Sequence, residues 1–162
     1  MAKDITPLLQ LIVFSIGHLN LALRIESVYK VSNHTPISGS GVGTVGVTHV
    51  DDIEVTVIDL YRRFFQSNPS EYSTGGYLVL VQNTTGEVYG IPVAETPVLM
   101  EVPLSLIRLL PQSYRYADTL DVASHVAVIP QDAASLTIFL LDVDRLLPVL
   151  AHNKNFSTSL SR

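Results

Sequence analysis

The sequence of 162 residues contains neither cysteine nor tryptophan, and only 15% of its residues are charged. The absence of cysteine excludes disulfides, thiolate metal sites and thiol nucleophiles, and it fits a reducing compartment. Lysine and arginine form no cluster, and the net charge is −5. Nucleic acid is therefore not an expected partner, because neutralisation of phosphates supplies most of the affinity of such binding.

The sequence also lacks an apolar run long enough to cross a membrane as a helix. The N-terminal run from Leu8 to Ile16 is interrupted by Gln10 and Ser15, and it has about half the length of a membrane span. No basic segment precedes this run and no small-residue cleavage site follows it, so a buried strand explains it better than a signal peptide. We expect a soluble, cytoplasmic protein without direct membrane insertion.

Apolar residues, in contrast, make up 47% of the chain, which excludes a disordered polypeptide. Most of them alternate with the period of two that is typical of strands. A short helix is expected after Asp59 and another after Asp142, with each aspartate as the N-cap. The polar segments 32–46 and 66–76 are expected to be loops. Strands are expected at residues 11–14, 21–25, 53–58, 77–81, 88–93, 98–102, 125–129 and 136–141.

The two halves of the chain repeat the same order of patterns. The alternating segment Leu21–Ile25 corresponds to Tyr89–Val93, and the segment 57–62 corresponds to 140–145. Both halves end with a strand, a capping aspartate, an apolar residue, a spacer and an arginine. Strand sets of this size tend to close into barrels, because closure removes exposed edges. The sequence therefore predicts two small β-barrels packed together.

A glycine motif and a histidine cluster are the two segments that could carry a ligand-binding or metal site. Residues 41–46 match the dinucleotide fingerprint G-x-G-x-x-G, but that site needs a strand before the motif and a helix after it. Here a loop precedes the motif and a strand-prone segment follows, so a flexible loop is the expectation. The segment His49–Asp52 is where a histidine and carboxylates cluster, yet a metal site needs three or four ligands. We expect an exposed strand end or turn there, and no metal.

Asp142 and Asp144 could be interpreted as an acid–base pair. Their position between a strand and an apolar helical turn favours helix capping instead. No serine lies in the context of a nucleophile elbow. We therefore expect a protein that is not an enzyme and has no cofactor, whose function is to hold other proteins together.

Four segments carry a resemblance to a known family: 11–17, 21–31, 46–60 and 140–147. The third of them corresponds to a family pattern of Gly-Val-x-Asn-Leu-Arg-Gly and then a strand that ends in an apolar residue, aspartate and leucine, although this chain has His49-Val50-Asp51-Asp52 in place of Asn-Leu-Arg-Gly. In this order and spacing, the chain resembles the CheW-type adaptor domain of bacterial chemotaxis over roughly residues 8–150, as a divergent member.

The resemblance implies a mainly β fold with two SH3-like five-stranded β-barrels packed around a shared hydrophobic core, with short helices. We expect a single domain over residues 8–150, flanked by terminal tails at 1–7 and 151–162. The first barrel is expected to comprise mainly residues 8–65 and the second mainly 77–141, with a closing helix at 142–150.

The resemblance also implies a function in signal transduction. CheW-type adaptors join the cytoplasmic tip of a chemoreceptor of the methyl-accepting type to the regulatory domain of a sensor histidine kinase, without catalysis, in chemotaxis or related motility control. One alternative is a divergent scaffold of the same fold that binds another signalling protein or its own copy. A third reading, from a different class, is a small ligand-binding or enzymatic β-barrel that uses His49–Asp52 and the glycine loop.

Two departures from the family pattern fall on the surface expected to meet the receptor. The family arginine of Asn-Leu-Arg-Gly is Asp51 here, and the glutamate of Val-x-Glu-Val is Lys30. If these side chains face each other, a Glu–Arg pair has become a Lys–Asp pair, worth only about 0–1 kcal/mol in stability. Its larger effect is on partner choice, unless the change is neutral drift. The residues expected to bind partners are Val28, Lys30, His49, Val50 and Asp51.

Overall fold

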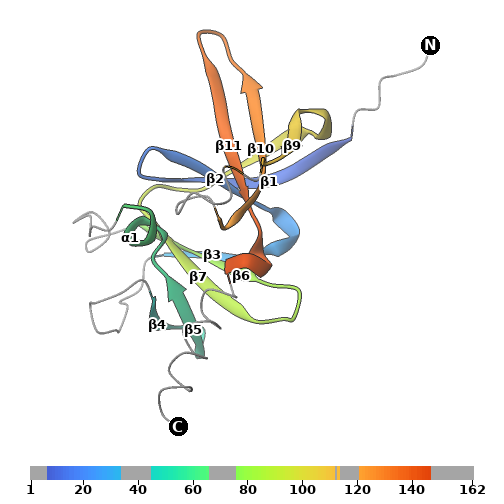
Figure 1. Ribbon diagram of the computed structural model, residues 1–162. Coiled ribbons are helices and arrows are strands. Elements are labelled where there is room, and N and C mark those ends of the chain that lie inside the picture. The colour runs from blue at the N-terminus through green and yellow to red at the C-terminus, as the bar shows by residue number, and fades with distance from the viewer. Residues whose placement is uncertain (1–6, 34–44, 66–75, 112, 114–120, 147–162) are drawn as a thin grey trace.

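The computed structural model describes residues 7–33, 45–65, 76–111, 113 and 121–146. They form two curled β-sheets with a few short helical segments, as Figure 1 shows. The six-stranded sheet has the order β8-β1-β2-β11-β10-β9. Its strands are β1 (Leu8–Ile16), β2 (Leu19–Arg24), β8 (Val98–Pro103), β9 (Ile107–Leu109), β10 (Ala123–Pro130) and β11 (Ser135–Leu141).

The five-stranded sheet has the order β3-β6-β7-β5-β4. Two 3₁₀ turns, η1 (Ile25–Ser27) and η3 (Leu104–Leu106), connect β2 to β3 and β8 to β9. The strands of this sheet are β3 (Val28–Asn33), β4 (Val45–Val50), β5 (Ile53–Ile58), β6 (Tyr77–Gln82) and β7 (Val88–Val93). The mainly β fold of two SH3-like barrels is confirmed, although one sheet has a sixth strand, the three-residue β9.

The repeat in the sequence corresponds to an exchange of strands between the two sheets. In the six-stranded sheet, β2 pairs in parallel with β11, and in the five-stranded sheet β7 pairs in parallel with β5. In the sequence repeat, β2 corresponds to β7, and the end of β5 corresponds to the end of β11. The six-stranded sheet therefore combines β1 and β2 of the first half with β8 to β11 of the second half. The five-stranded sheet combines β6 and β7 of the second half with β3 to β5 of the first half.

The expected division into a barrel at 8–65 and a barrel at 77–141 is corrected by this pairing. The six-stranded sheet contains residues 8–24 and 98–141, and the five-stranded sheet lies between them in sequence, at 28–93. The physical reason for this difference is that β2 and β7 are each buried on both faces of the sheet. One of the two faces is covered by residues from the other half of the chain. Local apolar patterns specify such strands but not which copy they pair with.

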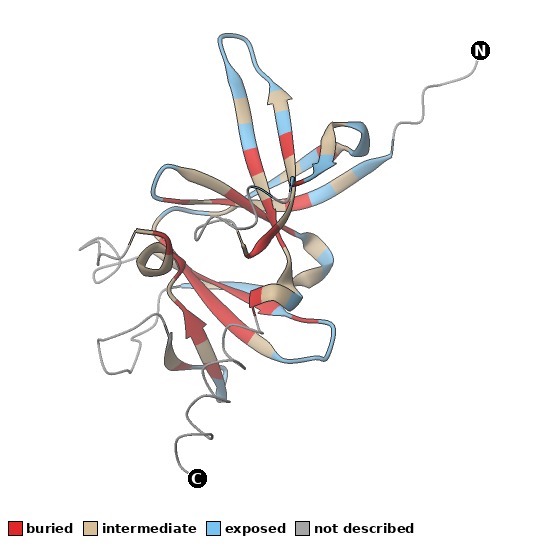
Figure 2. Ribbon diagram, in the orientation of Figure 1, coloured by how far each residue is buried: buried red, intermediate tan, exposed pale blue. Residues whose placement is uncertain are grey.

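Three clusters of buried residues fill the molecule, and Figure 2 shows the buried strands crossing its centre. The largest cluster is shared, since it contains Phe14 and Leu21 of one sheet and Val79 and Tyr89 of the other. The other two clusters fill the interior of each barrel separately. The expected shared hydrophobic core is therefore present, with a second core on the far face of each sheet.

Strand β7 shows why these central strands are apolar on both faces. Tyr89, Ile91 and Val93 point into the shared core. Between them, a Cβ added to Gly90 would lie 3.0 Å from the side chain of Leu78, which belongs to the interior of the five-stranded barrel. A strand with a packed layer on each side has no solvent face on which polar residues would alternate.

Both predicted helix caps are present. The backbone N–H of Arg62 donates to Asp59 Oδ1 at 3.0 Å at the start of α1 (Leu60–Phe65). The N–H of Asp144 donates in the same way to Asp142 Oδ1 at 3.0 Å, where a helical turn runs through residues 143–146. The rest of the expected closing helix, from residue 147, lies outside the described residues, as do 34–44 and 66–75 of the expected loops.

In the part of the chain that the structure describes, no helix is both long and apolar enough to span a bilayer. The glycine motif at 41–46 lies mostly outside the described residues. Its last two positions, Val45 and Gly46, open strand β4, so the helix that dinucleotide binding requires does not follow the motif.

Candidate partner-binding surface

The predicted partner residues gather where the five-stranded barrel closes. Strands β3 and β4 are the two edges of that sheet. Lys30 lies on β3, Asp51 follows β4 directly, and Lys30 Nζ donates to Asp51 Oδ2 at 2.5 Å. The two side chains therefore face each other, and their ion pair joins the two sheet edges. We call this region the seam and define it as β3 together with residues 49–54, which comprise the end of β4, the turn and the start of β5 (Ile53–Ile58).

The turn that carries Asp51 has an uncommon backbone. Asp51 and Asp52 link β4 to β5 as a two-residue loop, and their φ angles are +52° and +66°. Positive φ at both central positions is the requirement of a type I′ hairpin turn, which favours Asn-Gly. Aspartate tolerates this conformation better than most residues do. The turn therefore fixes the backbone of Asp51 at the seam.

The five predicted residues do not share one environment. Lys30, His49 and Asp51 are exposed, and His49 Nε2 lies 4.0 Å from Glu54 Oε2 on the neighbouring strand. Val50 is only 7% exposed and packs inside the five-stranded barrel. Val28 is half-buried against the shared core. The two valines thus position the seam but offer little surface to a partner.

Sequence reasoning missed the apolar part of the seam. Tyr29 and Val31 on β3 and Ile53 on β5 are large apolar side chains with exposed fractions of 54%, 39% and 46%. The available signal was that Tyr29 and Val31 flank a lysine in a segment without clear alternation. A β-bulge between Val28 and Lys30 breaks the period of two there, which hides which residues face solvent.

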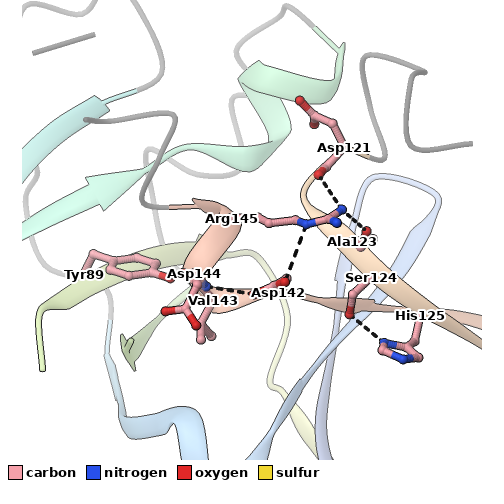
Figure 3. A network of polar contacts seen from close by, with 9 residues as sticks. All are labelled: Tyr89, Asp121, Ala123, Ser124, His125, Asp142, Val143, Asp144 and Arg145. Atoms are coloured by element: carbon pink, nitrogen blue, oxygen red, sulfur yellow. Dashed lines mark hydrogen bonds and ion pairs between the residues drawn. The ribbon is translucent and has the colours of Figure 1, made fainter. Parts of the chain in front are cut away.

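A second group of polar side chains holds the two repeats together. Arg63 Nη2, from α1, contacts Asp121 Oδ1 and Oδ2 at 2.8 and 2.7 Å. Arg145 donates to the backbone oxygens of Asp121 and Ala123, at 3.4 and 3.3 Å, as Figure 3 shows. Its Nε also lies 3.5 Å from Asp142. Asp121 is thus the point at which the ends of both repeats meet.

The carboxylates of Asp142 and Asp144 have structural partners. Asp142 caps a helical turn and pairs with Arg145. Asp144 Oδ1 accepts hydrogen bonds from the backbone N–H and the hydroxyl of Thr84, at 3.2 and 2.8 Å. These contacts support capping and loop anchoring rather than acid–base chemistry.

Tyr89 is buried beside these carboxylates. Its hydroxyl donates to the backbone oxygen of Val143 at 2.6 Å, and Figure 3 places the ring next to Val143 and Asp144. Burial, together with the negative charges of Asp144, Asp142 and Glu87, raises the pKa of Tyr89 far above its usual value. The phenol is therefore a neutral donor that anchors the closing turn to β7.

Among the described residues, no three or more histidine, aspartate or glutamate side chains form a group that could hold a metal ion. In the His49–Asp52 segment, His49 pairs with Glu54 and Asp51 pairs with Lys30. The segment is a strand end and turn, as expected, and its polar groups face different neighbours.

Comparison with known proteins agrees with this architecture. The family model described as CheW-like domain matches residues 10–150. The crystal structure of the scaffolding protein TtCheW from Thermoanaerobacter tengcongensis is similar, with a TM-score of 0.67, 17% sequence identity, and coverage of 88% of this chain and 90% of that chain. At this identity, the similarity shows the fold. No curated protein matches the sequence at a significant level.

Proposed function

We propose that this chain, which belongs to the CheW-like domain family, is a non-catalytic adaptor that couples a chemoreceptor to a sensor histidine kinase in the cytoplasm. The observation that carries the proposal is the family match over residues 10–150, together with a fold similar to that of a scaffolding protein. An adaptor needs rigid surfaces rather than reactive groups, and the carboxylates beside Tyr89 have structural partners.

The seam is the surface that we propose for partner contact. Three of the side chains predicted to bind partners are exposed there, those of Lys30, His49 and Asp51. The side chains of Val28 and Val50 pack against the buried clusters. The side chains of Lys30 and Asp51 are 41% and 66% exposed, so their ion pair contributes only about 0–1 kcal/mol to folding. Its polarity is opposite to the family pattern, and a partner fitted to that pattern would meet like charges.

A charge exchange at the seam tests this role. The double variant Lys30→Glu, Asp51→Arg keeps an ion pair possible and leaves the net charge unchanged. We expect weaker binding to the chemoreceptor tip or kinase regulatory domain of the same organism, with a loss of stability of about 1 kcal/mol at most, because arginine tolerates the positive φ of Asp51 less well than aspartate does. The matched control is Arg24→Glu, Glu26→Arg, an exposed pair at the end of β2 and in η1. Unaltered affinity for both partners in the seam variant would contradict the role of the seam.

The reversed polarity favours one alternative, a scaffold of the same fold whose partner is a different signalling protein or a second copy of the chain. Pull-down with the kinase regulatory domain separates the adaptor from this alternative, and addition of the receptor tip then tests the complete coupling. Failure of both purified partners to bind the wild-type chain refutes the adaptor function.

A further inference from the structure

The seam combines apolar surface with charge in a way that specifies its partner further. Tyr29 and Val31 flank Lys30 along β3, and Ile53 lies two positions after Asp51. All three are exposed. The other exposed large apolar residues of the described chain lie in β1, β8, η3, β9 and β10. In the described part of the five-stranded barrel, the exposed large apolar side chains are therefore those of the seam.

The charges around this apolar surface do not balance. Lys30 is neutralised by Asp51. Asp52, in the same turn, is exposed and forms no ion pair within the described residues, and Glu54 on β5 is exposed beside His49. The lysine, aspartate and glutamate side chains of the seam therefore carry a formal net charge of −2, one positive against three negative, and Asp52 and Glu54 flank the exposed Ile53 in the sequence. Their side chains are solvated, so they act on an approaching surface over roughly one Debye length, about 8–10 Å.

We infer that the seam binds a protein surface that presents lysine or arginine next to an apolar side chain. The inference rests on the proposed adaptor function and adds the chemistry of the partner. Burial of Tyr29 and Ile53 supplies contact energy that does not depend on salt, since it comes from apolar area. Asp52 and Glu54 raise the association rate of a basic surface and repel an acidic one.

The test separates charge from apolar contact with two variants. Asp52→Asn, Glu54→Gln removes the two carboxylates that flank Ile53 and keeps the Lys30–Asp51 pair. We expect its affinity for the partner that the wild-type chain binds to fall about tenfold at low salt, mainly through slower association. We also expect the difference from wild type to disappear toward about 1 M salt, where charges are screened. Tyr29→Ala should instead lower the affinity by a similar factor at every salt concentration.

The probes are the purified receptor tip and the purified kinase regulatory domain, with binding followed by surface plasmon resonance across a salt series. The matched control is Asp132→Asn, Glu101→Gln, which also removes two exposed carboxylates, one in the β10–β11 turn and one on β8 of the other barrel. Thermal unfolding of each variant verifies that it is folded.

Three results overturn the inference. Equal effects of the control Asp132→Asn, Glu101→Gln and of the seam variant Asp52→Asn, Glu54→Gln would mean that only the net charge matters. Wild-type affinity and salt dependence in the seam variant would leave the adaptor function standing but refute a basic partner. If neither probe binds the wild-type chain at any salt concentration, the adaptor function fails and the inference fails with it.

Discussion

Among the described residues, two ion pairs join distant segments, Arg63–Asp121 and Lys30–Asp51, and they should contribute very differently to stability. Arg63 and Asp121 are 58 residues apart and make contacts of 2.8 and 2.7 Å. The side chain of Arg63 is only 19% exposed and that of Asp121 is 43% exposed. Arg63 Nε is also buried without a hydrogen-bond partner among the described residues. Removal of the carboxylate would therefore leave a largely desolvated cation.

The magnitude follows from this burial. A hydrogen bond to a charged group is worth about 1.5–3 kcal/mol, and breaking a fully buried pair costs about 3–5 kcal/mol. Because Asp121 is partly exposed, water can solvate part of the guanidinium after truncation. We expect Asp121→Ala to lower the free energy of unfolding by about 2–3 kcal/mol and the Tm by roughly 5–10 °C for a domain of this size. Lys30→Met at the exposed seam should cost at most about 1 kcal/mol.

Urea unfolding followed by far-UV circular dichroism measures these differences, since the chain has no tryptophan. A double-mutant cycle with Arg63→Met isolates the pair. Because the double variant no longer carries the stranded cation, its cost should be smaller than the sum of the single costs, with a coupling of about 1–2 kcal/mol. If Asp121→Ala costs no more than Lys30→Met, the reasoning from burial is refuted.

Two further variants test the closing turn and the hairpin turn. The raised pKa of Tyr89 means that the folded state favours the protonated phenol. The contribution of this phenol to the free energy of unfolding is therefore complete at neutral pH and is lost as the pH rises above about 10, the pKa of tyrosine in the unfolded chain. Tyr89→Phe should lower the free energy of unfolding by about 1 kcal/mol at pH 7, because it removes the hydrogen bond to Val143. The stability of this variant should fall less steeply than that of the wild type when urea unfolding is repeated at rising alkaline pH. An identical fall in both proteins would contradict a buried, neutral phenol at Tyr89. Asp52→Gly should stabilise the chain by about 0.5–1 kcal/mol, because glycine adopts the positive φ of +66° without steric cost. Loss of stability in the same urea assay would argue against a type I′ turn.

The sequence predicted most strands because their periodicity is a local property. The expected strands 53–58 and 88–93 have the same bounds as β5 and β7, and the two aspartate caps were identified from the residues that follow them. The three-residue β9 is too short to show a period, and the bulge at Val28–Lys30 hides the pattern of β3.

What the sequence could not provide is pairing between distant segments. The contact of β2 with β11 joins Leu21 to Phe139, and no local pattern distinguishes this partner from β5. The Lys30–Asp51 contact was anticipated from the family resemblance rather than from spacing, since the two residues lie in different strand connections. The apolar residues of the seam were missed because exposure of a strand residue depends on which sheet edge is covered.

The exchange of strands also has a consequence for synthesis of the chain on the ribosome. All five strands of the five-stranded sheet lie within residues 28–93, so this sheet can form once residue 93 has emerged from the ribosome. The β1–β2 hairpin precedes this sheet in the chain, yet its neighbours β8 and β11 begin only at Val98 and Ser135. Until they emerge, apolar residues such as Leu11 and Ala22 lack the layer that covers them in the finished molecule. The β1–β2 hairpin is thus translated before the strands that cover it, and its apolar residues stay exposed in the nascent protein until those strands emerge, a state prone to aggregation.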